Sequence, residues 1–267
     1  MEILGYLASV FIGVSLGLIG GGGSILTVPV LVYLFRVDAV LATAYSLFIV
    51  GSTSLVGSFR YFQQGLVHVQ TAVVFGIPSI VAVYLTRAFL LPAIPDTIVQ
   101  MGSLTLSKSV LLMLLFAVLM IAASYSMIKQ PAKGSGLGQG IGDSMNFNYL
   151  LILLEGSVVG VLTGLVGAGG GFLIIPALVV LSNLPMKQAV GTSLVIIAAK
   201  SLLGLFGEEG LFSMDWGVLL RISGFAIGGI FIGMALSRRI AGDRLKPAFG
   251  WFVLLMGFYI ILKELVF

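Results

Sequence analysis

The sequence GLIGGGGSILTVPVL, residues 17–31, places four successive glycines, Gly20 to Gly23, in the middle of an apolar run from Gly5 to Phe35. Each glycine in a helix interior costs roughly 1 kcal/mol relative to alanine, so this stretch cannot continue one firm helix. The run is also too long for one straight membrane crossing, which needs about 20 residues. We therefore predict two short helices that meet at the glycines.

The composition of the chain is that of a membrane protein. Of its 267 residues, 59% are apolar and only 9% are charged, whereas an average soluble domain is about 25% charged. So few charges could not cover a soluble globule of this size, and we predict an all-α polytopic membrane protein. The net charge of +4 comes from basic residues scattered at segment ends, so we predict no nucleic-acid partner.

The residue types inside the apolar segments argue against a metal site and against catalysis. The chain has no cysteine and one histidine, so thiolate and multi-histidine metal sites are excluded. The apolar segments contain no cluster of His, Asp and Glu and no Ser/His pair. We therefore predict no cofactor, no metal and no enzymatic activity.

The second half of the chain repeats the first at a constant offset of 147 residues. Gly13–Phe59 aligns without a gap to Gly160–Phe206 with about twenty identities, and a second glycine cluster stands at Gly167–Gly171. Internal duplication of this kind indicates a repeat architecture. We predict a first transmembrane repeat over residues 1–128, a flexible linker over residues 129–146, and a second transmembrane repeat over residues 147–267.

Each repeat is predicted to contain one glycine-broken helix pair followed by three spans, which makes eight full spans, or about ten helices with the half-helices counted. Four crossings per half would make the repeats parallel, and five would make them inverted. The balance of Lys and Arg between the two sides of the membrane is the same for both arrangements, so it does not decide between them. We favour inverted repeats, because secondary transporters often combine them with broken helices. The six predicted single spans are Leu41–Phe59, Val67–Leu90, Val110–Ile128, Ala189–Phe206, Trp216–Leu236 and Pro247–Leu265.

The two predicted breaks are the part of the chain where we expect a ligand to bind. Broken backbone in a membrane is tolerated only where it is buried in protein or lines a cavity. The first turn of a returning half-helix has free N–H donors at the positive end of its dipole, and glycines let an oxyanion approach closely. We predict that the two breaks face each other and bind a small anion near the bilayer midplane. The outer glycines, in contrast, have the small-x3-small spacing of close helix packing; they are Gly13, Gly17, Gly160 and Gly164.

The helix after each break carries polar residues on one face. Ser46 and Thr53 are seven residues apart and share a face, and Ser193 and Lys200 occupy the equivalent positions, with Thr192 beside them. A lysine inside an apolar span usually marks a site or a water cavity. The alternatives are that Lys200 snorkels to a membrane face or pairs with an acid, and that the serine hydroxyls bond within their own helices.

Glu155 lies in the apolar stretch LILLEGSVVG near the start of the second repeat. It is a candidate for a proton-coupling carboxylate. The alternatives are an acid at the membrane interface and an acid paired with Lys200.

At these residues the chain resembles the sulfite exporter TauE/SafE family, also called the toluene-sulfonate uptake permease group. The resemblance is carried by GLIGGGGSILTVPVL and GLVGAGGGFLIIPAL, by the helix starts ATAYSLFIV and AVGTSLVII, and by RYFQQGLVH. It covers essentially the whole chain. It implies transport of sulfite, sulfonates or related organic anions across a prokaryotic plasma membrane.

We therefore predict a secondary transporter of small sulfur-containing oxyanions that works by alternating access. The alternatives are a passive anion channel and a transporter of a different small organic anion. The predicted partners are the anion and the lipid bilayer, and the sequence leaves open whether two copies form a homodimer. The predicted substrate-binding residues are Gly21, Gly22, Gly23, Ser24, Ser46, Gly169, Gly170, Gly171, Thr192, Ser193 and Lys200, with Glu155 as the candidate for proton coupling.

Overall fold

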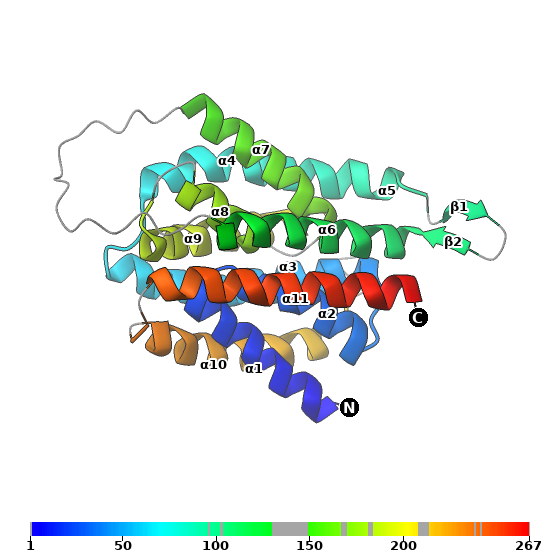
Figure 1. Cartoon of the computed structure of the whole chain (residues 1–267), viewed down its shortest axis with the longest axis horizontal. Coiled ribbons are helices and arrows are strands. Elements are labelled where there is room, and N and C mark those ends of the chain that lie inside the picture. Colours follow the sequence, from blue (N-terminus) through cyan, green and yellow to red (C-terminus); the bar gives the residue numbers. More distant parts are fainter. Residues whose placement is uncertain are drawn as a thin grey trace.

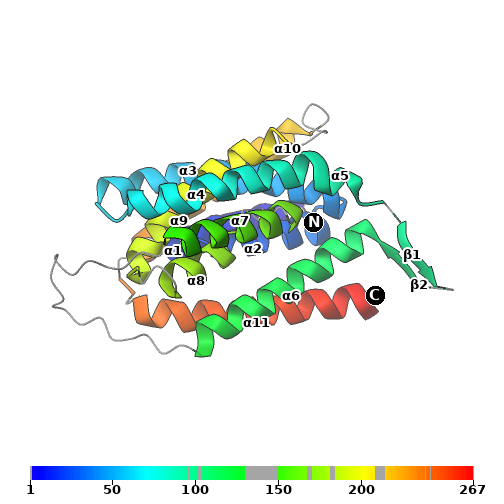
Figure 2. The same ribbon diagram turned by 90° about the horizontal axis from the view of Figure 1, so that it is seen from above.

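The computed structural model describes residues 2–95, 97–101, 104–129, 149–166, 170–180, 184–207, 214–237, 239–240 and 242–266. Most of these residues form helices that run along the long axis of the molecule (Figures 1 and 2). Two π-helical turns, η1 (Val30–Leu34) and η2 (Thr86–Leu90), extend α2 and α4. The helices are α1 (Glu2–Ile19), α2 (Gly22–Pro29), α3 (Ala39–Gln63), α4 (Val69–Leu85), α5 (Leu91–Ala93), α6 (Lys108–Lys129), α7 (Tyr149–Val166), α8 (Gly171–Val180), α9 (Met186–Leu205), α10 (Trp216–Ser237) and α11 (Gly242–Val266).

Both glycine clusters interrupt a helix, as predicted. The first helix ends at Ile19 and the next begins at Gly22, while Gly20 has a φ of 76°. The second cluster separates α7 from α8, and Gly170 has a φ of 71°. Glycine adopts this left-handed conformation without the steric cost that a Cβ atom adds. The prediction of two short helices at each break is therefore confirmed, although residues 167–169 lie outside the described part.

The described helices are those of a polytopic membrane protein. Five of them are long and apolar enough to cross a bilayer within the part of the chain that the structure describes, and three shorter apolar helices accompany them. Large apolar side chains such as Phe11 and Leu255, which are 67% and 68% exposed, cover the outside. Each of the six predicted single spans coincides with a helical segment to within a few residues. The predicted linker lies outside the described residues, apart from Lys129, which ends α6.

A short β-hairpin corrects the all-α prediction. Strand β1 (Thr97–Met101) pairs antiparallel with β2 (Leu104–Ser107) between α5 and α6, and the hairpin lies beyond the helix ends in Figure 1. Pro92 and Pro95 disfavour further helix, and the following Thr, Ile and Val residues favour a strand. An open strand edge is not tolerated in hydrocarbon, so this segment belongs outside the bilayer.

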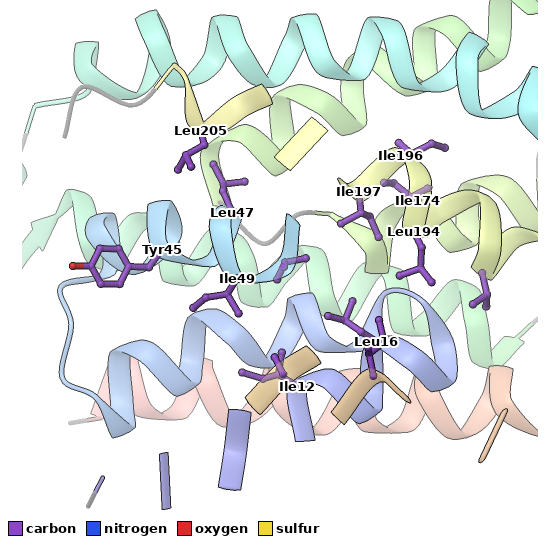
Figure 3. Packing of buried hydrophobic residues seen from close by; sticks show 14 of the residues in the cluster. Ile12, Leu16, Tyr45, Leu47, Ile49, Ile174, Leu194, Ile196, Ile197 and Leu205 are labelled. Carbon is purple, nitrogen blue, oxygen red and sulfur yellow. The ribbon is translucent and has the colours of Figure 1, made fainter. Parts of the chain in front are cut away.

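The main helix contacts join the two halves of the chain. Helix α1 packs mainly against α10, α7 against α4, α3 against α9, and α6 against α11. Figures 1 and 2 show α1 starting toward the end of the molecule that holds the C-terminus, whereas α7 starts at the opposite end. The buried core also mixes the halves: one cluster of buried residues, part of which is drawn in Figure 3, includes Leu16 and Leu47 of the first half and Ile174, Leu194 and Ile197 of the second.

The outer glycines pack helices closely, as predicted. A Cβ atom added to Gly13 would overlap the backbone oxygen of Ala226 in α10. At Gly160 the added atom would lie 2.6 Å from the backbone oxygen of Ser79 in α4. Only glycine lets these helix backbones come so close. Gly17 and Gly164, one turn further along α1 and α7, are crowded against the same partner helices.

Candidate functional site

The two breaks touch each other. A Cβ atom added to Gly171, the first residue of α8, would lie 2.5 Å from the Cα atom of Gly21 and 3.2 Å from the backbone oxygen of Gly20. Real Cβ atoms essentially never approach another heavy atom closer than 3.0 Å. The contact is therefore made by backbone from both halves, and any side chain at Gly171 would push them apart. Of the other predicted residues, Gly169 lies outside the described part of the chain.

The start of α2 presents backbone donors without side-chain partners. Its N-cap residue, Gly21, provides no side-chain acceptor for the first turn, and Gly22 and Gly23 are buried. The Ser24 hydroxyl donates to the backbone oxygen of Gly21 at 2.6 Å, so this hydrogen bond lies within the first break. Ser24 can therefore serve an anion through its backbone N–H, whereas its hydroxyl proton is already used.

Ser193 links α9 of the second half to the first break. Its Oγ lies 2.9 Å from the position that a Cβ atom on Gly20 would occupy, and it donates to the backbone oxygen of Val190 at 2.8 Å. The equivalent residue, Ser46 of α3, is 0% exposed and has no hydrogen-bond partner among the described residues. Hydroxyl bonding within the helix therefore holds for Ser193 and not for Ser46.

Lys200 reaches the second break from α9. Its side chain is 1% exposed, and its Nζ donates to Thr163 Oγ1 of α7 at 3.0 Å. The same Nζ is 2.5 Å from the position of a Cβ atom on Gly170. The ammonium group therefore points into the protein and does not snorkel to a membrane face.

Glu155 is not the partner of Lys200. It lies eight residues before Thr163 on α7, which is about 12 Å along the helix axis. Its side chain is partly buried, and its Oε2 has no hydrogen-bond partner among the described residues. No carboxylate in the described part of the chain forms an ion pair with Lys200, whose hydrogen-bond acceptor is a neutral hydroxyl.

Thr192 faces away from the breaks. Its Oγ1 accepts a hydrogen bond from the backbone N–H of His68 at 2.9 Å, and His68 is the N-cap residue of α4. Successive helix residues point about 100° apart, so Thr192 cannot share the face of Ser193. The structure thus gives Thr192 a role in holding the loop before α4.

Thr163 is the site residue that sequence reasoning missed. It is 1% exposed and bonds both Lys200 and the backbone oxygen of Gly160. A signal was present in the repeat: at the offset of 147 residues, Thr163 replaces Leu16 and Lys200 replaces Thr53. Such paired differences between the two halves indicate a polar contact that the first half lacks.

The assembled site suits a small oxyanion. It combines the backbone N–H groups of a helix start that has no side-chain cap with the ammonium group of Lys200, and helix starts of this kind bind anions. Its residues are buried, so this conformation encloses the site.

Comparison with known proteins matches the chain to one family of membrane proteins. A family profile described as "Sulfite exporter TauE/SafE" matches residues 5–260. A protein of Xylella fastidiosa (strain 9a5c) named "Probable membrane transporter protein" is 27% identical over 95% of this chain and 92% of its own length. "Probable membrane transporter protein YunE" of Bacillus subtilis is 27% identical over 90% of this chain and 88% of its own length. "Probable membrane transporter protein MJ0441" of Methanocaldococcus jannaschii is 29% identical over 73% and 67%, respectively. No solved structure matches the chain significantly.

Proposed function

This chain belongs to the sulfite exporter TauE/SafE family of multi-pass membrane transporters, and we propose that it is a secondary transporter of small sulfur-containing oxyanions such as sulfite or organosulfonates. We place it in the plasma membrane of a prokaryote. The observation that carries the proposal is the contact between Gly171 and Gly20–Gly21, with Lys200 at the edge of the second break.

The anion is held by backbone and by one cation in this proposal. The N–H groups of Gly22 to Ser24 and of Gly169 to Gly171 bind its oxygens, and Ser46, Ser193 and Lys200 complete the site. Hydrogen bonds that involve a charged group contribute roughly 1.5–3 kcal/mol each. A buried ammonium group is costly without a counter-charge, and the substrate provides that charge.

Transport proceeds by movement of one half of the chain against the other, with the halves as inverted repeats. One observation supports the inversion, and a second supports the repeat itself. Helices α1 and α7 start at opposite ends of the molecule (Figure 1). The glycine contacts are also equivalent in the two halves. Gly13 contacts Ala226, and the residues at the equivalent positions of the other half, Gly160 and Ser79, contact each other. Rocking of such repeats around a central site is a common route to alternating access.

The membrane potential favours export of an anion. Moving one charge across 100 mV contributes about 2.3 kcal/mol, and an inside-negative potential drives anions outward. Uptake would need a coupled proton or cation. Glu155, with its unpartnered Oε2 among the described residues, is the candidate that would carry the proton.

Flux measurements with purified protein test the proposal. Proteoliposomes should accumulate labelled sulfite and a labelled alkylsulfonate, and a carboxylate of similar size should compete poorly. Gly171→Ala should abolish this flux, because the added methyl group separates the breaks. Gly224→Ala is the matched control, since a Cβ atom there has nothing within 4 Å. Equal flux by both variants would contradict binding of the anion where the two breaks meet, which we call the paired break. Preference for the carboxylate would favour a different organic anion as substrate.

A passive channel is the second candidate, and the exchange of substrate separates it from a transporter. Unlabelled sulfite on the far side should accelerate the exit of labelled sulfite if the protein alternates between two states. Flux that is independent of far-side substrate and does not saturate would identify a channel. The buried state of the site favours the transporter.

A further inference from the structure

Two adjacent cavities are lined by residues at the end of α3. Figure 1 shows that α3 ends on the side of the molecule opposite the β-hairpin. They have volumes of about 200 Å³ and 50 Å³ and share Gln64 and Met234 in their walls. We call the pair the antechamber. The walls of the larger cavity are formed by Arg60, Gln64, Phe231, Met234 and Ala235, and those of the smaller one by Tyr61, Gln64, Leu66, Lys187, Met234 and Ser237.

The charge of the antechamber is positive. Arg60 and Lys187 line it together with the neutral polar side chains of Gln64 and Ser237, and none of its described wall residues is a carboxylate. The guanidinium group of Arg60 lies 5.8 Å from the centre of the Phe231 ring, which keeps it at the wall of the larger cavity. One water molecule takes up about 30 Å³ of liquid, so the larger cavity has room for a small hydrated oxyanion.

Helix α9 leads from the antechamber to the paired break. Lys187 lines the smaller cavity, Gly191 lies one turn further on, and Ser193 contacts the first break at Gly20. Lys187 and Ser193 are separated by about 9 Å along the helix axis, at 1.5 Å per residue. The antechamber thus lies within two turns of the proposed binding site.

Tyr61 lines the smaller cavity of the antechamber and contacts α1 close to the first break. It is 6% exposed, and its hydroxyl donates to the backbone oxygen of Gly17 in α1 at 3.2 Å. Its ring packs on α9 where Gly191 has no side chain, 3.1 Å from the position of an added Cβ atom. Tyr61 is therefore wedged between α1 of the first half and α9 of the second.

We propose that the antechamber is a second binding site for small oxyanions and that Tyr61 is the gate between it and the paired break. The gate opens when α1 and α9 move apart, which breaks the hydrogen bond from Tyr61 to Gly17. With this end in the cytoplasm, as the export proposal requires, the antechamber loads anions for export. The inference rests on the proposed transport function for the identity of the anion, but not for the position of the gate.

The absence of cysteine from the chain gives a direct test of the gate. Ser193→Cys places a thiol behind Tyr61, and Gln64→Cys places one in the antechamber. A negatively charged methanethiosulfonate reagent should modify the thiol at position 64 quickly and the thiol at position 193 slowly. Adding Tyr61→Ala should accelerate modification at position 193 by tenfold or more, and Tyr61→Phe, which loses only the hydrogen bond, by a few-fold.

Phe62→Ala is the matched control for the gate, because Phe62 is the adjacent aromatic residue and is 61% exposed. It should leave the modification rate at position 193 unchanged. Equal rates at position 193 with Tyr61 intact, with Tyr61→Phe and with Tyr61→Ala would overturn the gate. The Tyr61→Phe variant decides the matter if Tyr61→Ala fails to fold.

The anion preference of the antechamber is tested by comparing reagents of opposite charge on the Gln64→Cys variant. Arg60→Gln combined with Lys187→Gln should lower the rate of the negative reagent several-fold relative to the positive one. An unchanged ratio would overturn the binding site. Both modification assays work without transport. If the modification rates are as expected but the protein does not transport sulfite, the proposed function alone is rejected. If the protein transports sulfite but the modification rates are not as expected, this inference alone is rejected.

Discussion

Replacing Lys200 with methionine separates the binding role of this lysine from any structural role, because the two roles predict opposite changes. The substitution keeps an unbranched apolar stem and removes the ammonium group. In the structure Nζ donates to Thr163 Oγ1 at 3.0 Å, and Thr163 itself donates to the backbone oxygen of Gly160 at 3.2 Å. Thr163 therefore stays hydrogen-bonded in Lys200→Met, and the substitution leaves no new buried polar group without a partner.

The expected magnitudes follow from this geometry. Replacing a buried charge with an apolar group of similar volume often stabilises a protein by about 1–4 kcal/mol. We expect the free energy of unfolding of the empty protein to rise by an amount in this range. One hydrogen bond from a charged group contributes about 1.5–3 kcal/mol, and each 1.4 kcal/mol is about tenfold in affinity. The KM for sulfite should therefore rise by roughly 10- to 150-fold.

Two measurements check these values. Unfolding of purified protein without anions gives the stability change, and the concentration dependence of sulfite flux in proteoliposomes gives the KM. Thr53→Val is the control, because Thr53 occupies the equivalent position, is 0% exposed and has no hydrogen-bond partner among the described residues. It should change neither quantity by much. If Lys200→Met has the wild-type KM, Lys200 does not bind the anion. If this variant is less stable than the wild type, Lys200 has a counter-charge, which contradicts the prediction.

Three further substitutions test the packing and the neighbouring polar groups. Gly229→Ala should lower the free energy of unfolding by about 1–3 kcal/mol, because its Cβ atom would overlap the backbone of α1; the adjacent Gly228→Ala, with nothing within 4 Å, should not lower it, and paired melting curves decide. Thr192→Val should cost about 1 kcal/mol, because it removes the acceptor of the hydrogen bond that the backbone N–H of His68 donates, and Thr192→Ser should restore most of the stability in the same melting assay. Ser46→Ala should not destabilise the empty protein, since its hydroxyl has no partner among the described residues; the flux assay should show a several-fold higher KM, and an unchanged KM would exclude Ser46 as a ligand.

Much of the helical layout could be predicted because its causes are local. Successive glycines weaken a helix whatever surrounds them, and the breaks at Gly20–Gly21 and Gly170 follow directly. The close contacts of Gly13 and Gly160 could be predicted for the same reason. The partner helices could not, since small-residue spacing shows that a helix packs closely and says nothing of the helix it meets.

The site was harder to predict because its contacts join distant parts of the chain. Lys200 was recognisable from its charge in an apolar span, but its partner Thr163 depends on the placement of α7 against α9. Thr192 was grouped with its neighbour Ser193, although adjacent helix residues face different directions. The β-hairpin was missed because its strands are far shorter than the apolar spans that dominate the sequence.

The contact between Gly21 and Gly171 has a consequence for how such a protein changes its substrate over evolution. A pocket whose centre is main chain keeps its shape when the side chains around it drift, because the N–H groups belong to the backbone. In the proposed site, the centre would recognise what all oxyanions share, and the surrounding positions, such as those of Ser46 and Lys200, would be free to distinguish one from another. Selectivity can then diversify by single substitutions while the glycine clusters stay as they are.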